Sequence, residues 1–131
     1  MVKLPKPSSV VAVQDEQDPS MDEILRIIHD TIDLRKGENT IILDVSEQVD
    51  YLDYLIIANG LTALHNRAIM DYVIAELARY DIMPDGLNGY ENGEWILADF
   101  GVMTVHLFTP ALREFYRLEE LWSAGRAVEM N

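Results

Sequence analysis

The chain has 131 residues, of which 49% are hydrophobic and 25% are charged, and its formal net charge is −13. This is the composition of one ordinary globular domain that can bury a core, and no apolar run reaches the ~20 residues that span a bilayer. The chain has no cysteine, which excludes disulfides, thiolate catalysis and cysteine-ligated metals. The acidic surface disfavours broad docking on nucleic-acid phosphates and suits a basic protein partner, although charge alone identifies no partner.

The N-terminal segment, residues 1–19, carries prolines and serines without a periodic apolar pattern, so we expect a disordered arm. It has neither the apolar stretch of a signal peptide nor the acid-poor character of an organellar transit peptide. We therefore expect a cytoplasmic protein. A single folded domain over residues 20–123 and a C-terminal tail over residues 124–131 complete the predicted organisation.

Ser20 and Glu23 form a capping-box pattern ahead of apolar residues at helical spacing, which predicts a first helix over Met21–Lys36. Two short apolar runs follow, as in strands that are covered on both faces, and they predict strands over Thr40–Val45 and Tyr51–Asn59. Alternation along the second strand divides its side chains between two faces: Tyr54, Ile56 and Ala58 on one, Leu55 and Ile57 on the other.

A turn at Asn59-Gly60 ends the second strand, and Thr62 is the expected cap of a second helix that ends near Tyr80. The glycine-rich segment after this helix is mostly connection. A short strand is predicted within it, around Ile82–Leu87.

Two further strand-like runs, Glu94–Phe100 and Val102–Phe108, are separated only by Gly101, a spacing that predicts a tight antiparallel hairpin. Thr109-Pro110 then predicts the start of a final amphipathic helix. The apolar positions of that helix are Leu112, Phe115, Leu118, Leu121 and Trp122. The order of elements predicts an α/β (α+β) fold with one mixed sheet of four to five strands, covered by helices.

Strand alternation divides the first hairpin strand into two faces, with Trp95, Leu97 and Asp99 on one and Ile96, Ala98 and Phe100 on the other. A lone tryptophan on a strand is usually a core residue, since it buries a large apolar area. A tryptophan flanked by carboxylates is also typical of a protein-interface anchor. The pattern by itself leaves both interpretations of Trp95 open.

The sequence offers no catalytic constellation, because the glycine-rich phosphate loops and the paired-histidine zinc motif are absent. The turn from Asn59 to Thr62 joins a strand to a helix, where nucleotidyltransferases bind an anion, but no D-x-D pair follows it to hold Mg²⁺. We therefore expect no enzyme activity, catalytic residue, cofactor or metal. A nucleotidyltransferase-like, nucleotide-binding enzyme is the alternative, and a bare dimerisation module is a third interpretation.

Three stretches read G-E-N-T-I-I-L-D-V (residues 37–45), D-Y-L-I-I-A-N-G (residues 53–60) and G-E-W-I-L-A-D-F-G (residues 93–101). The last continues through Val105-His106 to the R-E-F-Y-R-L-E-E-L-W of residues 113–122. Together they resemble the ribosomal silencing factor family, also called RsfS, YbeB or Iojap-related proteins. The resemblance covers Met21 to Trp122.

The resemblance implies a translation repressor with a nucleotidyltransferase-like topology that lacks the catalytic carboxylates. Members bind the large ribosomal subunit through its protein fourteen and sterically block joining of the small subunit when nutrients fail, and they are often dimeric in isolation. Carried over by position, the partner-binding residues of this chain are Trp95, Leu97, Asp99, Asp53 and His106.

The chain departs from the family pattern at two places. Val102 follows Gly101 where the family commonly has aspartate, and residues 61–65, L-T-A-L-H, replace its T-S-S-R-H. If those residues help to contact the subunit, the affinity or register of binding differs in this protein.

Overall fold

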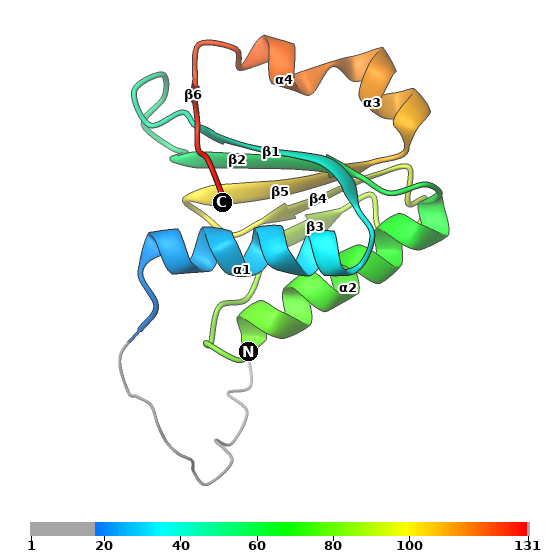
Figure 1. Ribbon diagram of the computed structural model, residues 1–131, viewed down its shortest axis with the longest axis horizontal. Helices are drawn as coiled ribbons and strands as arrows, with labels where there is room; N and C mark the ends of the chain where they lie inside the picture. Colours follow the sequence, from blue (N-terminus) through cyan, green and yellow to red (C-terminus); the bar gives the residue numbers. More distant parts are fainter. Residues whose placement is uncertain (1–17, 131) are drawn as a thin grey trace, which may run out of the picture.

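The computed structural model describes residues 18–130, which form a single six-stranded sheet with helices on both faces (Figure 1). The strand order across the sheet is β3-β4-β5-β2-β1-β6. In chain order the elements are α1 (Met21–Leu34), β1 (Glu38–Asp44), β2 (Tyr54–Asn59), α2 (Ala63–Ala78), β3 (Gly86–Asn88), β4 (Trp95–Asp99), β5 (Met103–Phe108), α3 (Pro110–Tyr116), α4 (Leu118–Leu121) and β6 (Arg126–Ala127).

The sheet is mixed, as the sequence predicted. The central strands β2 and β5 are parallel, whereas β1 pairs antiparallel with β2 and β4 pairs antiparallel with β5. The β4–β5 pair is the hairpin predicted around Gly101, which takes a φ of 90° at the turn. Glycine tolerates this left-handed conformation without the steric cost that a side chain would add.

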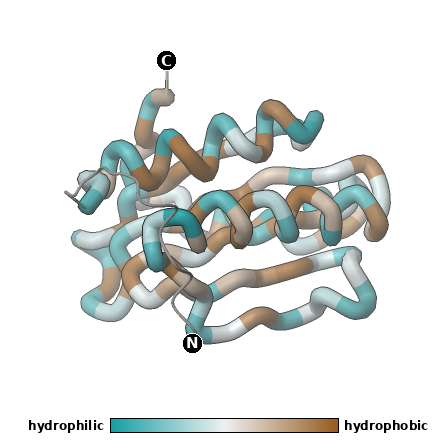
Figure 2. Tube along the Cα trace, turned by 90° about the horizontal axis from the view of Figure 1, so that it is seen from below, coloured by the Kyte–Doolittle hydropathy of each residue, from teal (hydrophilic) through white to brown (hydrophobic). Residues whose placement is uncertain are grey.

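One face of the sheet packs against α1 and α2 and forms the main core. Figure 2 shows hydrophobic segments along these helices and along the strands beside them. The fully buried members of this core are Leu25, Ile28, Ile32, Ile56, Ala58, Ile69, Met70, Val73, Leu77, Ile96, Ala98, Val105 and Leu107. The predicted division of β2 is confirmed, because Ile56 and Ala58 lie in this core and Leu55 and Ile57 lie in a second cluster.

The first helix begins as predicted and ends two residues early. The Ser20 side chain accepts from the Glu23 N–H, and the Glu23 carboxylate accepts from the Ser20 N–H, so the capping box is complete. The predicted end at Lys36 is wrong, since Lys36 has a φ of 71° and the helix stops at Leu34. This left-handed residue turns the chain toward Gly37 and β1.

The opposite face of the sheet carries the smaller second cluster, which lies under α3 and α4 (Figure 1). Its buried residues are Leu43, Val45, Leu52, Leu55, Ile57 and Phe108, and Leu112, Leu118 and Trp122 pack on it. These helices therefore cover the β1–β2–β5 part of this face.

The single final helix predicted from the sequence is wrong. Arg117 has a φ of 46°, and this left-handed residue divides the segment into α3 and α4. The apolar residues at helical spacing do not share one buried face, because Phe115 and Leu121 are 74% and 81% exposed. Thr109 precedes α3 as expected, although its side chain makes no capping hydrogen bond.

The sheet has one strand more than the four to five predicted. β6, at Arg126–Ala127, lies in the segment that we expected to be a tail, and it pairs with the outer edge of β1. The predicted short strand also exists, displaced to Gly86–Asn88. The expected N-terminal arm lies, for residues 1–17, outside the described residues.

Candidate protein interface

Strand β4 presents the predicted pair of faces. Ile96 and Ala98 are fully buried in the main core, whereas Trp95, Leu97 and Asp99 on the other face are only partly buried. The α3–α4 segment packs over the β1–β2–β5 part of this face and reaches β4 where Tyr116 contacts Trp95. The rest of β4 lies beyond β5 in the strand order. We call Trp95, Leu97 and Asp99 the β4 surface.

The indole of Trp95 is both packed and accessible. Its ring lies 4.8 Å from the Phe108 ring and 4.7 Å from the Tyr116 ring, measured between centroids. Its Nε1–H donates to Nδ1 of His106 over 3.1 Å. Three neighbours therefore fix a large amphipathic side chain that keeps part of its surface in solvent. Trp95 thus packs as a core residue does and is accessible as an interface anchor is, which are the two interpretations that the sequence left open.

His106 supports this arrangement from below the surface. It is 5% exposed, and burial lowers its pKa to about 4, so the ring is neutral at pH 7. Because an indole N–H can only donate, Nδ1 of His106 must accept, and the ring proton is on Nε2. That Nε2–H faces the hydroxyl oxygen of Thr104 at 3.1 Å. His106, which we expected among the partner contacts, thus acts on the surface through Trp95.

The far end of the β4 surface is acidic. The carboxylate of Asp99 accepts from the N–H of Gly101 and so stabilises the hairpin turn. The N–H of Asp53 donates to the carbonyl of Val102 on the same turn over 2.7 Å, and the N–H of Asp85 donates to the carbonyl of Asp99 over 2.7 Å. Three aspartates therefore flank this hairpin; Asp85 is one that the sequence did not single out.

Trp95 and Asp99 occupy opposite ends of a five-residue strand. At about 3.4 Å per residue, their Cα atoms lie about 14 Å apart. The predicted residues thus form an elongated surface with an aromatic end and an acidic end, joined by Leu97.

The turn after β2 uses its backbone donors internally. The N–H of Gly60 donates to the side-chain oxygen of Asn66 over 2.9 Å, and the N–H of Leu61 donates to Nδ1 of His65 over 3.0 Å. The side-chain amide of the buried Asn66 also donates to the carbonyl of Gly93 over 2.9 Å. The donors that a phosphate would need at this turn are therefore already occupied.

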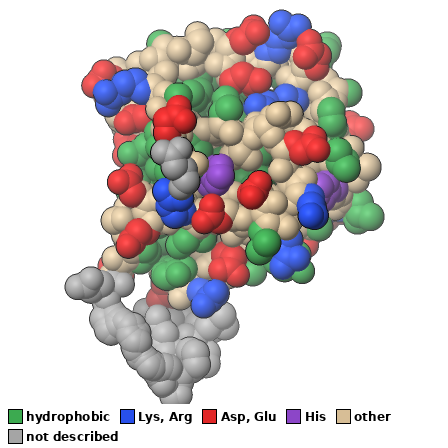
Figure 3. Space-filling model, in the orientation of Figure 1, with side chains coloured by type: hydrophobic (Ala, Val, Ile, Leu, Met, Phe, Trp, Pro, Cys, Tyr) green, Lys and Arg blue, Asp and Glu red, His purple; other side chains and the backbone are tan. Residues whose placement is uncertain are grey.

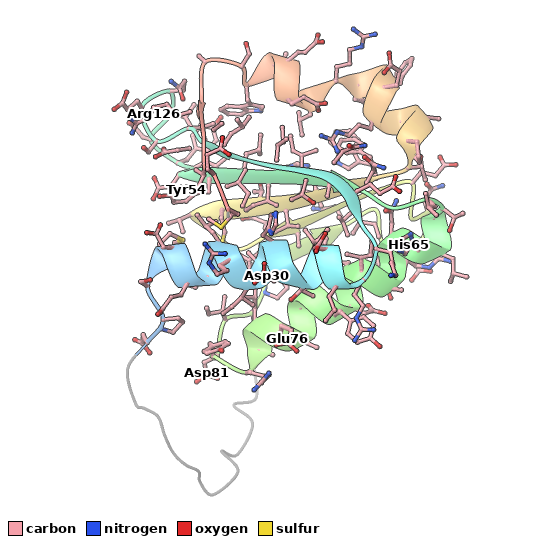
Figure 4. All side chains as sticks on the ribbon, viewed as in Figure 1. Asp30, Tyr54, His65, Glu76, Asp81 and Arg126 are labelled. Atoms are coloured by element: carbon pink, nitrogen blue, oxygen red, sulfur yellow. The ribbon has the colours of Figure 1, made fainter. Side chains whose placement is uncertain are left out.

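His65 joins this turn to the first helix, and Figure 4 labels it near the start of α2, beside the end of α1. With Nδ1 accepting from Leu61, the ring proton is on Nε2, and it donates to the carbonyl of Arg35 over 2.8 Å. Local sequence pattern does not indicate the contact between His65 and Arg35, because these residues are 30 positions apart.

A metal cluster and a membrane-spanning helix are both absent from residues 18–130. Within residues 18–130, no three histidine, aspartate or glutamate side chains are placed so that they could share a metal ion. Among the helices of the same range, none combines the length and the apolar character that crossing a bilayer requires.

Comparison with known proteins identifies the family. The chain is 31% identical over 104 residues to the ribosomal silencing factor RsfS of Chromobacterium violaceum, covering 79% of this chain and 85% of that protein. It is also 31% identical over 85 residues to the mitochondrial assembly of ribosomal large subunit protein 1 of Mus musculus, covering 63% of this chain and 37% of that protein. A crystal structure from Chromobacterium violaceum is similar with a TM-score of 0.77 and 30% identity, over 80% of this chain and 88% of that one. The family model described as "Ribosomal silencing factor during starvation" matches residues 18–131, and the chain therefore belongs to the ribosomal silencing factor family.

Proposed function

We propose that this protein binds the large ribosomal subunit through a basic ribosomal protein, its protein fourteen, and sterically blocks association with the small subunit. It represses translation in this way under nutrient limitation, in the cytoplasm. The β4 surface, with Asp53 beside it, makes the contact. The observation that carries the proposal is the Trp95 indole, held by His106, Phe108 and Tyr116 while part of it stays in solvent.

An anchored tryptophan suits a binding surface better than it suits a reaction centre. Interface hot spots are enriched in tryptophan and lie where neighbours exclude water. Because Trp95 is fixed before binding, little side-chain entropy is lost when a partner covers it. The names of the relatives support a ribosomal target, and that of the Mus musculus relative refers to assembly of the large subunit.

The charge distribution supports a basic partner. Most arginines of the described chain contact groups within it, namely Arg35, Arg67, Arg79, Arg113, Arg117 and Arg126. In residues 18–130, by contrast, Asp53, Asp85 and Asp99 have no ion pair with lysine or arginine. Unpaired carboxylates beside an apolar contact steer and orient a cationic surface.

Sedimentation of ribosomal subunits tests the proposal. Wild-type protein should migrate with large subunits and reduce the yield of joined ribosomes, and Trp95→Ala should weaken binding by a factor of ten or more, since hot-spot truncations cost about 2 kcal/mol. Leu34→Ala, which truncates an exposed side chain on α1, is the matched control and should bind like the wild type.

Because Trp95 also packs on the second cluster, its loss can destabilise the fold. Leu97→Glu, a change at a partly exposed position of the same surface, provides a second variant, and circular dichroism checks that both are folded. A folded Trp95→Ala protein that blocks joining as well as the wild type does would show that the assigned surface is wrong.

The enzyme alternative makes a different prediction. A nucleotide-binding protein should melt at a higher temperature with millimolar nucleoside triphosphate and Mg²⁺, because a ligand that binds the native state stabilises it. With the donors of Gly60 and Leu61 occupied by Asn66 and His65, we expect no shift in the melting temperature.

A homodimer of the isolated protein stays a prediction. Competition between large subunits and self-association would separate a silencing factor from a bare dimerisation module.

A further inference from the structure

The end of α3 exposes two neighbouring aromatic rings. Phe115 is 74% exposed and Tyr116 is 48% exposed, and the two rings meet edge to face with centroids 5.0 Å apart. We call this pair the α3 shelf. Within the described residues, the Tyr116 hydroxyl has no hydrogen-bond partner.

The α3 shelf is continuous with the β4 surface. Tyr116 lies 4.7 Å from Trp95, which in turn stacks on Phe108 at 4.8 Å. Four rings therefore run in series from the fully buried Phe108 to the largely exposed Phe115. The two exposed rings of this series, those of Tyr116 and Phe115, have no role in the contact proposed above.

The α3 shelf is also held rigidly in place. Arg113 on α3 donates from its guanidinium to the side-chain oxygen of Asn59, at the end of β2, over 3.0 Å. It also forms an ion pair with Glu119 on α4 at 3.2 Å. Leu112 and Leu118, on either side of the shelf in sequence, pack on the second cluster. Phe115 itself belongs to neither buried cluster, so burial does not explain its presence.

We propose that the α3 shelf is the second half of the docking surface and receives a lysine or arginine side chain of the basic protein partner on its exposed rings. The proposal rests on the proposed function. Cations are attracted to the faces of aromatic rings, and the free Tyr116 hydroxyl can accept a hydrogen bond from an ammonium or guanidinium group. Between α3 and α4, the exposed cation Arg117 pairs with Glu114 and Glu120, which reduces its repulsion of an incoming cation.

Charge favours this partner over a second copy of the chain. Two copies would each bring a net charge of −13 to the contact, and like charges across an interface oppose association. A basic protein removes that repulsion and adds electrostatic steering. The α3 shelf and the acidic end of the β4 surface thus suit the same basic partner. They lie at opposite ends of one interface.

The test measures affinity for purified large subunits by co-sedimentation over a concentration series. Phe115→Ala should bind about tenfold more weakly and should melt at the wild-type temperature, because Phe115 lies outside both clusters. Phe115→Tyr keeps an aromatic face and should retain most of the affinity, whereas Phe115→Leu keeps only apolar area and should lose a large part of it. Leu34→Ala is the control for truncating an exposed apolar side chain elsewhere.

The outcomes separate the two proposals. If Trp95→Ala weakens binding and Phe115→Ala does not, the inference fails while the proposed function stands. If wild-type protein does not sediment with large subunits, the proposed function itself fails. If Phe115→Leu binds as well as wild type, the cation contact is wrong, and if Phe115→Ala only converts a dimer to a monomer, the shelf joins two copies of this chain.

Discussion

At the scale of single residues, the hydrogen bond between Trp95 and His106 links the surface to the core. A protonated His106 would place an N–H opposite the indole N–H, so the bond exists only with the neutral ring. The neutral form is the one that burial also favours, since burial lowers the His106 pKa to about 4. Trp95 orientation and His106 protonation are therefore coupled.

This coupling predicts a dependence of stability on pH. In the unfolded chain histidine has its ordinary pKa near 6.5, so between about pH 6.5 and 4 the unfolded state binds more protons than the folded state does. The free energy of unfolding should therefore fall as the pH is lowered through this window, by up to about 3 kcal/mol, and this contribution should be constant above pH 6.5. Urea denaturation followed by circular dichroism at several pH values measures it.

His106→Asn is the matched control, because the asparagine Oδ1 can accept from Trp95 and does not titrate. The variant keeps His29 and His65, so the difference between its curve and that of the wild type isolates His106. We expect a flatter curve for the variant between pH 6.5 and 4. Parallel curves would mean that His106 titrates normally in the folded protein.

Sequence alternation predicted part of the site correctly. It placed Trp95, Leu97 and Asp99 on one face of β4, because the period of a strand is fixed by its backbone. It could not predict that His106 lies opposite Leu97 in the neighbouring strand or that Tyr116 reaches Trp95 from α3. Those contacts depend on register and on tertiary packing, which local periodicity does not contain.

At the scale of elements, the break between α3 and α4 is the main departure from expectation. Helical spacing of apolar residues continues through Arg117, and nothing in that spacing indicates a left-handed residue there. Leu112, Leu118 and Trp122 all reach the second cluster, which the two short helices achieve by turning at Arg117. Packing against the sheet therefore overrides the helical period.

Arg117 offers a test of that interpretation. A left-handed backbone costs free energy for a residue with a Cβ atom and little for glycine. Both Arg117→Gly and Arg117→Ala remove the exposed ion pairs to Glu114 and Glu120, but only glycine relieves the backbone. We expect the glycine variant to melt a few degrees higher than the alanine variant in a thermal denaturation followed by circular dichroism. The opposite order would mean that Arg117 is not left-handed in solution.

At the scale of the whole molecule, the β4 surface lies toward one edge of the sheet, and the acidic charge is spread more widely (Figure 3). β3 forms one edge and β6 the other, and β5, β2 and β1 separate the β4 surface from β6. Figure 3 shows carboxylates spread over the face of the molecule seen in that view, with arginines and lysines among them. The acidic charge thus covers more of the molecule than the proposed interface alone.

The C-terminal segment closes the β1 edge. Residues of β6 pair with Leu43 and Asp44 of β1, and the N–H of Val128 donates to the carbonyl of Ile42 over 2.9 Å. The Val128 side chain also packs against the main core. Figure 4 shows Arg126 near this end of the sheet, where its guanidinium lies 3.9 Å from the Asp44 carboxylate.

Removing residues 124–131 should therefore affect stability and association, and should spare binding to large subunits. We expect a loss of about 2 kcal/mol in the free energy of unfolding from the lost burial and hydrogen bonds. The exposed edge of β1 should also promote self-association, because unpaired strand edges are templates for pairing. Urea denaturation measures the first effect and sedimentation velocity over a range of concentrations measures the second.

A deletion of residues 129–131, which keeps β6, is the control and should stay closer to the wild type in both stability and association. Large-subunit binding should persist in both deletions, since the β4 surface is separated from the deleted strand by three others; a folded 124–131 deletion that no longer binds would place the C-terminal segment in the interface.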